Sequence, residues 1–211
     1  MAEHDGASEL PIFELPVVLL PSEMMPLHIF EERYQRMIRH CLEEEEPFGV
    51  VFRDEDGSAR RIGCTARVTE VLERFDDGRL DIVVAGEEPF RVLERFEAEE
   101  YPAGEVEPIA SDEEPPGDED AAHEVRETFA ALVERVSGSE PDGEGILDGD
   151  AYAIAARVEL PPETKQRLLE LRSEDERMRT LGAALEELIE TLSRSREIAE
   201  RARMNGKVVF E

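Results

Sequence analysis

The stretch IFELPVVLLPSEMMPLHIFEERYQRMIRHCL, residues 12–42, contains the change of hydrophobic period that decides the fold. Its first part predicts a strand over Ile12–Leu20 that stops at Pro21, and then a short extended piece over Pro26–Phe30. From Glu31 to Leu42 the apolar residues recur every three or four positions, which predicts one amphipathic helix. The N-terminal part of the chain is therefore expected to combine short strands with a single helix.

Alternating apolar and polar residues continue as far as Ile109 and predict further strands. The Asp77-Gly78 pair between two such stretches predicts a tight hairpin, and the shift of the apolar face after Glu70 predicts a bulge. The additional strands are expected over Phe48–Phe52, Ile62–Val68, Leu80–Ala85, Phe90–Phe96 and Tyr101–Ile109. About six or seven short strands at this spacing are typical of a small barrel or sandwich.

The pattern changes at residues 111–120, SDEEPPGDED, which have no apolar large residue and predict a solvated acidic linker. Helical periodicity follows, with Asp150 as an N-cap and a Ser173-x-x-Glu176 capping box before a long last helix. The predicted class is α+β, with a β-barrel domain over 1–110, a linker over 111–120 and a helical bundle domain over 121–211. The last helix carries an apolar stripe that can pack on neighbouring helices or on a second chain; its members are Met178, Leu181, Leu185, Leu188 and Leu192.

The charge of the chain excludes several classes of partner. Asp and Glu number 53 against 24 Lys and Arg, a formal net charge of −29. Such a surface repels phosphate backbones and anionic lipid, so neither nucleic acid nor membrane is an expected partner. Only Lys165 and Lys207 are lysines, and heavy acidity with little lysine favours a protein kept soluble in concentrated salt.

The location predicted from the sequence is cytoplasmic. The N-terminus is polar and acidic, unlike a signal peptide, and no apolar run approaches the ~18 residues of a membrane span. Cys41 and Cys64 are far apart in sequence, which favours reduced thiols packed as small apolar side chains.

Several motifs, in order, closely resemble those of the N-terminal, substrate-binding domain family of Lon proteases. They are ELPVVLLP at 14–21, PLHIFEERY at 26–34, IGCTA at 62–66 and LPPETKQRLLE at 160–170. The resemblance implies a PUA-like pseudobarrel followed by a helical bundle. It also implies a module that helps to capture protein substrates.

The sequence departs from full-length Lon in its chemistry. It contains no G-x-x-x-x-G-K-[ST] loop: Val208 follows Gly206-Lys207, and Arg201 stands where the first glycine is needed. It also contains no G-x-S-x-G motif and no EF-hand spacing. The predictions are therefore a stand-alone family member without ATPase or peptidase, no catalytic or metal-binding residue, and no cofactor.

Binding through apolar surface is the function that the sequence favours. Met24 and Met25 are expected in the loop between the first two strands, and adjacent residues there cannot both point into one core. Because methionine adapts to varied partners, the two side chains are candidates to rim an apolar patch for exposed hydrophobic segments. In the alternative, one methionine fills the end of the barrel. Phe30, Tyr34 and Met37 are assigned to the core.

The leading hypothesis is thus a non-catalytic protein- or peptide-binding module, acting as an adaptor or regulator in protein quality control. Its expected partners are unfolded polypeptides, with a partner protease and self-association as further expectations. The alternative is a small-molecule-binding protein or enzyme with a cleft between the two domains. RNA binding, suggested by analogy with other PUA-like barrels, is opposed by the net charge of −29.

Overall fold

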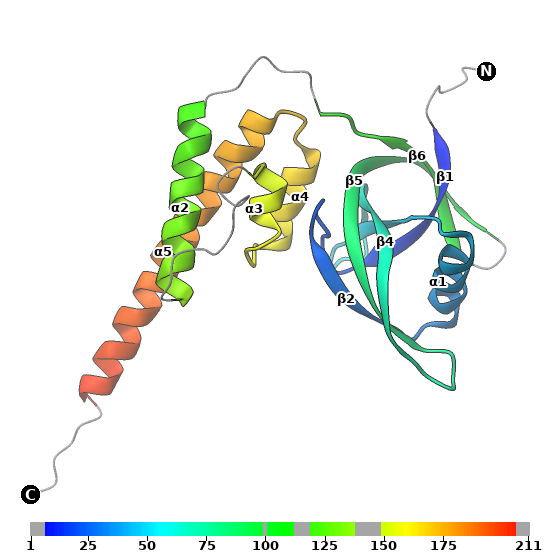
Figure 1. Cartoon of the computed structure of the whole chain (residues 1–211), viewed down its shortest axis with the longest axis horizontal. Helices are drawn as coiled ribbons and strands as arrows, with labels where there is room; N and C mark the ends of the chain where they lie inside the picture. The colour runs from blue at the N-terminus through cyan, green and yellow to red at the C-terminus, as the bar shows by residue number, and fades with distance from the viewer. Residues whose placement is uncertain (1–6, 99–100, 112–118, 138–148, 206–211) are drawn as a thin grey trace, which may run out of the picture.

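The computed structural model describes residues 7–98, 101–111, 119–137 and 149–205. A mixed sheet comes first in the chain and helices follow, so the α+β class is confirmed (Figure 1). The elements are β1 (Ser8–Leu15), β2 (Met24–Ile29), α1 (Glu32–Glu44), β3 (Phe48–Arg53), β4 (Ala59–Arg74), β5 (Leu80–Glu97), β6 (Pro102–Pro108), α2 (Glu119–Ser137), α3 (Ala151–Ala155), α4 (Pro162–Glu170) and α5 (Glu174–Asn205).

The strands pair in the order β2-β5-β4-β3-β1-β6, and β6 also pairs with β5. Five of the described strands therefore form a closed ring, while β2 lies outside it. The pair β1–β3 is parallel and all the other described pairs are antiparallel. Strand β5 belongs to the ring and also holds β2, because its residues Leu80–Ala85 pair with β2 and its residues Phe90–Glu97 pair with β6.

Two strand predictions need correction. The two strands expected over 80–85 and 90–96 are one strand, β5, because its pairing with β4 continues through shifts of register between them. The first strand covers Ser8–Leu15 instead of 12–20, since Pro16 interrupts it and Val18–Leu20 pack as a buried loop. The bulge predicted after Glu70 corresponds to register shifts on both sides of that residue.

The local signals for α1 and for the tight turn are confirmed. Helix α1 buries Tyr34, Met37, Ile38 and Cys41 on one face. The ring of Tyr34 lies 4.1 Å from that of Phe13 in β1, centroid to centroid, so this face packs on the sheet. The turn between β4 and β5 contains Gly78 with φ of 88°, a conformation that glycine adopts without the strain of a Cβ atom.

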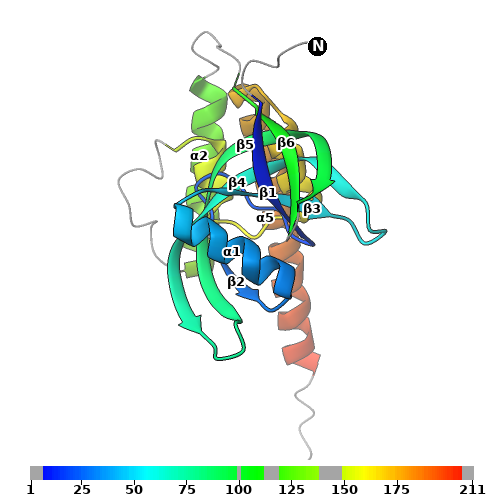
Figure 2. The same ribbon diagram turned by 90° about the vertical axis from the view of Figure 1, so that its right-hand side faces the viewer.

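The helical part is built around α2 and α5. Asp150 caps α3, since its Oδ1 accepts a hydrogen bond from the Ala153 N–H at 2.8 Å. Ser173 Oγ accepts from the Glu176 N–H at 3.2 Å at the start of α5. Both figures place this part and α1 on opposite sides of the strands (Figures 1 and 2). Among the described helices, none is long and apolar enough to cross a membrane.

The core runs from the sheet into the helices. One cluster of buried side chains includes Phe48 in β3, Phe129 in α2, Leu168 in α4 and Leu185 in α5. The predicted division at 111–120 stays a prediction, because residues 112–118 lie outside the described residues, although Glu119 and Asp120 already belong to α2. The stripe on the last helix is buried at Met178, Leu181 and Leu185, and half-buried at Leu188 and Leu192.

Candidate functional site

Strand β2 carries the candidate methionines and turns one side of its chain to solvent. Met24 and Met25 are the first two residues of this strand, so their predicted place in a loop is wrong. Met24 is 59% exposed, whereas Met25 is half-buried and packs against the core. The strand alternation separates them, because successive side chains point to opposite faces of a sheet.

Phe30 lies directly after β2 and is 63% exposed, so its assignment to the core is wrong. Its predecessor Ile29 is buried, and the strand alternation therefore directs Phe30 outward. Helix α1 begins only at Glu32, so Phe30 does not share the buried stripe that starts at Tyr34. The sequence pattern started the apolar stripe of the helix at Phe30, whereas in the structure the buried stripe starts one turn later, at Tyr34.

The outer face of β2 continues onto its neighbour β5. In the register of this pair, Met24 lies opposite Ala85 and Pro26 opposite Val83. We define the β2 surface by the outward side chains of the two strands and the adjoining phenylalanine: Met24, Pro26, His28, Phe30, Val83 and Ala85. Most of these side chains are apolar, so partial cover by a partner would remove apolar area from water.

The aromatic end of the β2 surface is held by His28. His28 Nδ1 lies 2.5 Å from Asp81 Oδ1 on β5. The imidazole ring stacks at 6.1 Å from the ring of Phe30 and meets the edge of Phe75 at 6.0 Å, centroid to centroid. These contacts hold an exposed aromatic group beside the end of the strand.

Acidic side chains border the β2 surface. Glu70 of β4 pairs with Val83, and Glu73 pairs with Asp81, so the three carboxylates lie on the same outer face. The guanidinium of Arg67 is already engaged, with Nε 3.0 Å from Glu87 Oε1. The apolar surface is therefore flanked by negative charge.

The start of β2 is fixed by the residues around Glu23. Glu23 Oε1 lies 2.5 Å from Lys165 Nζ of α4, both side chains being 12% exposed, and Glu23 Oε2 accepts from the Leu20 N–H at 3.0 Å. The Gly86 N–H donates to the Glu23 carbonyl at 2.9 Å. A Cβ atom on Gly86 would lie 2.1 Å from the carbonyl oxygen of Leu20, so only glycine fits there. Strand β2 is thus held in place by the helical part as well as by β5.

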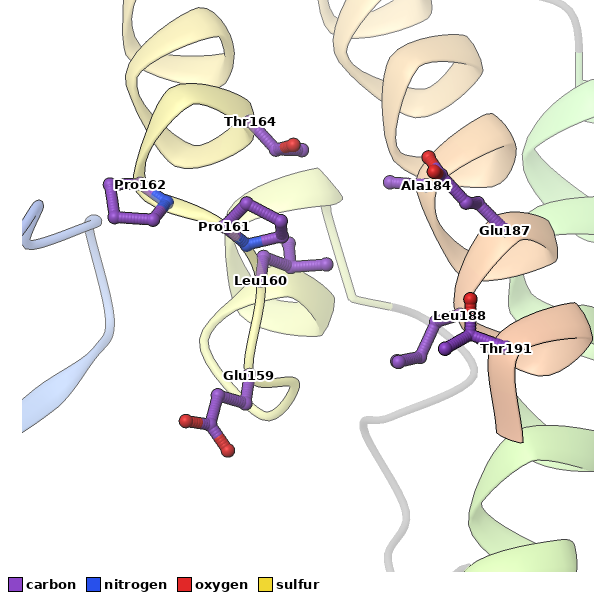
Figure 3. Close-up of a pocket in the computed structure, with 9 residues that line it drawn as sticks. All are labelled: Glu159, Leu160, Pro161, Pro162, Thr164, Ala184, Glu187, Leu188 and Thr191. Carbon is purple, nitrogen blue, oxygen red and sulfur yellow. The ribbon is translucent and has the colours of Figure 1, made fainter. Parts of the chain in front are cut away.

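A second apolar surface lies in the helical part. A groove of about 430 Å³ separates the segment that joins α3 to α4 from α5 (Figure 3). Leu160 and Pro161 line one side of this groove, and Ala184 and Leu188 of α5 line the opposite side. An adjoining groove of about 420 Å³ shares Glu159 and Leu188 and extends to α2, where its lining residues are Phe129, Leu132, Val133, Val136 and Ser137.

A more polar cleft of about 840 Å³ lies where the sheet meets α4. The turn between β3 and β4 forms one wall, and Pro162 and Glu163 form the other. The arginines of this cleft are committed to neighbouring groups: Arg53 pairs with Glu14, and Arg60 Nε lies 3.2 Å from Asp54 Oδ2. A cleft therefore lies between the sheet and α4, but its two arginines pair with carboxylates of the protein itself.

The cysteines are packing residues. Cys41 and Cys64 are both buried free thiols. Burial, reinforced by the carboxylate of Glu46, raises the pKa of the Cys41 thiol to about 11, and burial also raises the pKa of Cys64. Both are therefore protonated at neutral pH and poorly nucleophilic. In the part of the chain that the structure describes, no group of three or more His, Cys, Asp or Glu could hold a metal ion.

Comparison with known proteins gives one consistent relationship. The sequence model of one protein family, the ATP-dependent protease La (LON) substrate-binding domain, matches residues 9–187. The Lon protease of Paraburkholderia phytofirmans is 25% identical in an alignment 227 residues long, gaps included, that covers 96% of this chain and 27% of that protein. The Lon protease of Anaeromyxobacter dehalogenans is 27% identical, with coverages of 93% and 24%. The chain thus spans about a quarter of these curated relatives.

Two solved structures have a similar fold. The Lon N-terminal domain protein from Xanthomonas campestris superposes with a TM-score of 0.61 at 27% identity, covering 83% of this chain and 98% of that one. The N-terminal domain of the Mycobacterium avium complex Lon protease gives a TM-score of 0.66 at 21% identity, with coverages of 85% and 98%.

Proposed function

Because this chain belongs to the family of the Lon protease substrate-binding domain, we propose that it is a non-catalytic module that binds exposed apolar segments of polypeptides. The observation that carries the proposal is the β2 surface, where Met24 on the strand is 59% exposed and Phe30, directly after it, is 63% exposed. Single exposed apolar side chains are common, but several of them side by side on one face mark an interaction site.

The binding contact is apolar and adaptable. Methionine is unbranched and can repack against different partners, and an exposed phenylalanine can cover a large apolar area. Covering one such side chain contributes roughly 1.5–3 kcal/mol, so loss of either one weakens binding by a factor of about ten or more. Since the contact is apolar, binding is expected to persist in salt.

The cellular role that fits this activity is that of an adaptor or regulator in cytoplasmic protein quality control. A partner protease would receive the polypeptides that this chain binds. Support comes from the relatives, which are Lon proteases and match this chain over about a quarter of their length. We also propose that the sheet is a PUA-like pseudobarrel and that the helices form a bundle.

The test uses a permanently unfolded client, a small protein that has been reduced and carboxamidomethylated. Met24→Ser and Phe30→Ser should each reduce its affinity about tenfold, measured by fluorescence anisotropy. The matched control is Ile198→Ser on α5, which removes a side chain that is 67% exposed far along the chain. Circular dichroism checks that each variant is folded. Unchanged affinity in both β2 variants contradicts the proposal.

A further inference from the structure

We propose that β2 binds its client by strand addition, so that an extended segment rich in apolar and basic residues pairs along the free edge of β2. The inference rests on the proposed function and adds the backbone conformation in which the client is held. It follows from three features of β2: its place in the sheet, the direction of its backbone groups and the charge around it.

The first feature is the free edge. Strand β5 pairs with β2, β4 and β6, while β1, β3, β4 and β6 each have two partners. Of the described strands, only β2 has a single partner, β5. A strand with one unpaired side is a template for another chain, and many peptide-binding domains use such an edge.

The second feature is the direction of the backbone groups. The carbonyl of Glu23 accepts from the Gly86 N–H and therefore faces β5, while the Glu23 N–H donates to the Leu20 carbonyl. The register is unbroken from Met24 opposite Ala85 to Ile29 opposite Leu80. In an antiparallel pair the hydrogen-bonding direction alternates, so Met24, Pro26 and His28 direct their backbone groups away from β5.

Pro26 agrees with this assignment. Proline has no N–H to donate. Pro26, opposite Val83, is one of the residues whose backbone faces away from β5, so the pairing with β5 loses no hydrogen bond there. The free edge therefore offers two N–H groups, on Met24 and His28, and three carbonyl groups. A client strand can satisfy these groups along a length of five residues, Met24–His28.

The third feature is the chemistry of the surroundings. A client strand beside β2 places alternate side chains next to Met24 and Pro26, which favours apolar residues at those positions. On the same face, the carboxylate of Asp81 lies on the neighbouring strand β5, those of Glu70 and Glu73 lie one strand further away on β4, and the chain carries a net charge of −29. The field therefore attracts lysine and arginine and repels acidic segments.

The probe is a fluorescein-labelled, capped eight-residue peptide of alternating valine and lysine. Two further versions carry N-methyl groups on the four valines or on the four lysines. Only one set of peptide N–H groups faces β2, so one methylated version should lose about tenfold or more in affinity and the other should not. Equal loss in both versions, or no loss in either, overturns strand addition.

Amide hydrogen exchange followed by NMR locates the pairing. Adding the unmethylated peptide should slow exchange at the Met24 and His28 amides, and leave Met25 and Leu27 unchanged because those amides already face β5. His28→Pro should weaken peptide binding about tenfold relative to His28→Ala, since both variants lose the imidazole but only the first loses the N–H.

The outcomes separate this inference from the proposed function. If the unfolded client binds with no one-sided effect of methylation, strand addition is wrong and the proposed function stands. If the client does not bind, both are wrong. If Met24 and His28 are protected without peptide and the protein sediments as a dimer, the edge pairs with a second copy, and client addition is again overturned.

Discussion

At the scale of single residues, the contact between Lys165 and Glu23 joins the helical part to the start of β2. Both side chains are 12% exposed. Lys165→Met leaves the Glu23 carboxylate largely buried without its cation, which is expected to lower the free energy of unfolding by about 2–4 kcal/mol. Urea denaturation measures this change.

The control for that prediction is Arg194→Ala on α5. Arg194 pairs with Glu190, but the two side chains are 73% and 66% exposed. An exposed pair of this kind contributes about 0.5 kcal/mol or less. Equal effects of the two substitutions would show that the contact between α4 and β2 does not stabilise the fold.

Cys41 gives a prediction about pH. Its folded pKa is about 11, raised mainly by burial from an ordinary value of 9.0. A group whose pKa is raised by folding contributes stability below its unfolded pKa and loses it as the pH rises toward the folded value. The free energy of unfolding should therefore fall between about pH 9 and pH 11.

The measurement is a series of urea titrations at increasing pH. Cys41→Ala removes the thiol, so its stability should decline less steeply over the same interval, although cavity formation lowers its value at every pH. Identical slopes in the two proteins would contradict the assignment.

Sequence reasoning succeeded at residues whose environment is set locally. The caps formed by Asp150 and Ser173 depend on neighbours three residues away, and both were predicted. Phe30 was assigned wrongly because it lies at the change of period, where a strand pattern and a helix pattern both accommodate it. The exposure of Met24 depends on its partner strand, which the local pattern does not identify.

At the scale of elements, Gly86 decides how the loop before β2 packs on β5. A Cβ atom at this position would lie 2.1 Å from the backbone oxygen of Leu20, which cannot move independently of its loop. Gly86→Ala should therefore lower the free energy of unfolding by roughly 2 kcal/mol or more and weaken client binding by displacing β2. Thermal unfolding and client anisotropy test the two effects.

The matched control is Gly182→Ala in α5. An added Cβ atom there would lie 2.9 Å from one side-chain methyl group of Val125 and meets no backbone atom of another element, so a small shift of that side chain relieves the contact without rotation of its restricted χ1. Alanine also favours helix over glycine by about 1 kcal/mol, so the net change should be small. A destabilisation as large as that of Gly86→Ala would contradict the role given to the Leu20 backbone.

The elements were predictable to different degrees. Helix α1 and the turn at Asp77-Gly78 follow from short-range patterns and are confirmed. The fusion of two predicted strands into β5 depends on β4, which pairs across Gly86 and Pro89. Such pairing joins residues far apart in the sequence, so alternation alone cannot reveal it.

At the scale of the whole molecule, the net charge of −29 predicts a response to salt. Self-repulsion in the folded state is screened as the Debye length falls from about 30 Å at 0.01 M to about 8 Å at 0.15 M salt. The free energy of unfolding should rise by about 2 kcal/mol over this interval.

Sodium chloride titrations of the urea midpoint measure the effect. Screening is largely complete below about 0.5 M, whereas exclusion of salt from the surface continues to act at higher concentrations. A gain concentrated at low salt therefore identifies electrostatic repulsion. A midpoint that does not move between low and molar salt would contradict both this prediction and adaptation to concentrated salt.

The pairing of β6 with both β1 and β5 has a consequence for stoichiometry. Among the described strands, ring closure leaves only β2 with a free edge, so a titration with the peptide is expected to saturate at a ratio of one to one. A long unfolded chain with several matching stretches would recruit several copies side by side. Tethering copies together would raise their avidity without any change in the individual contact.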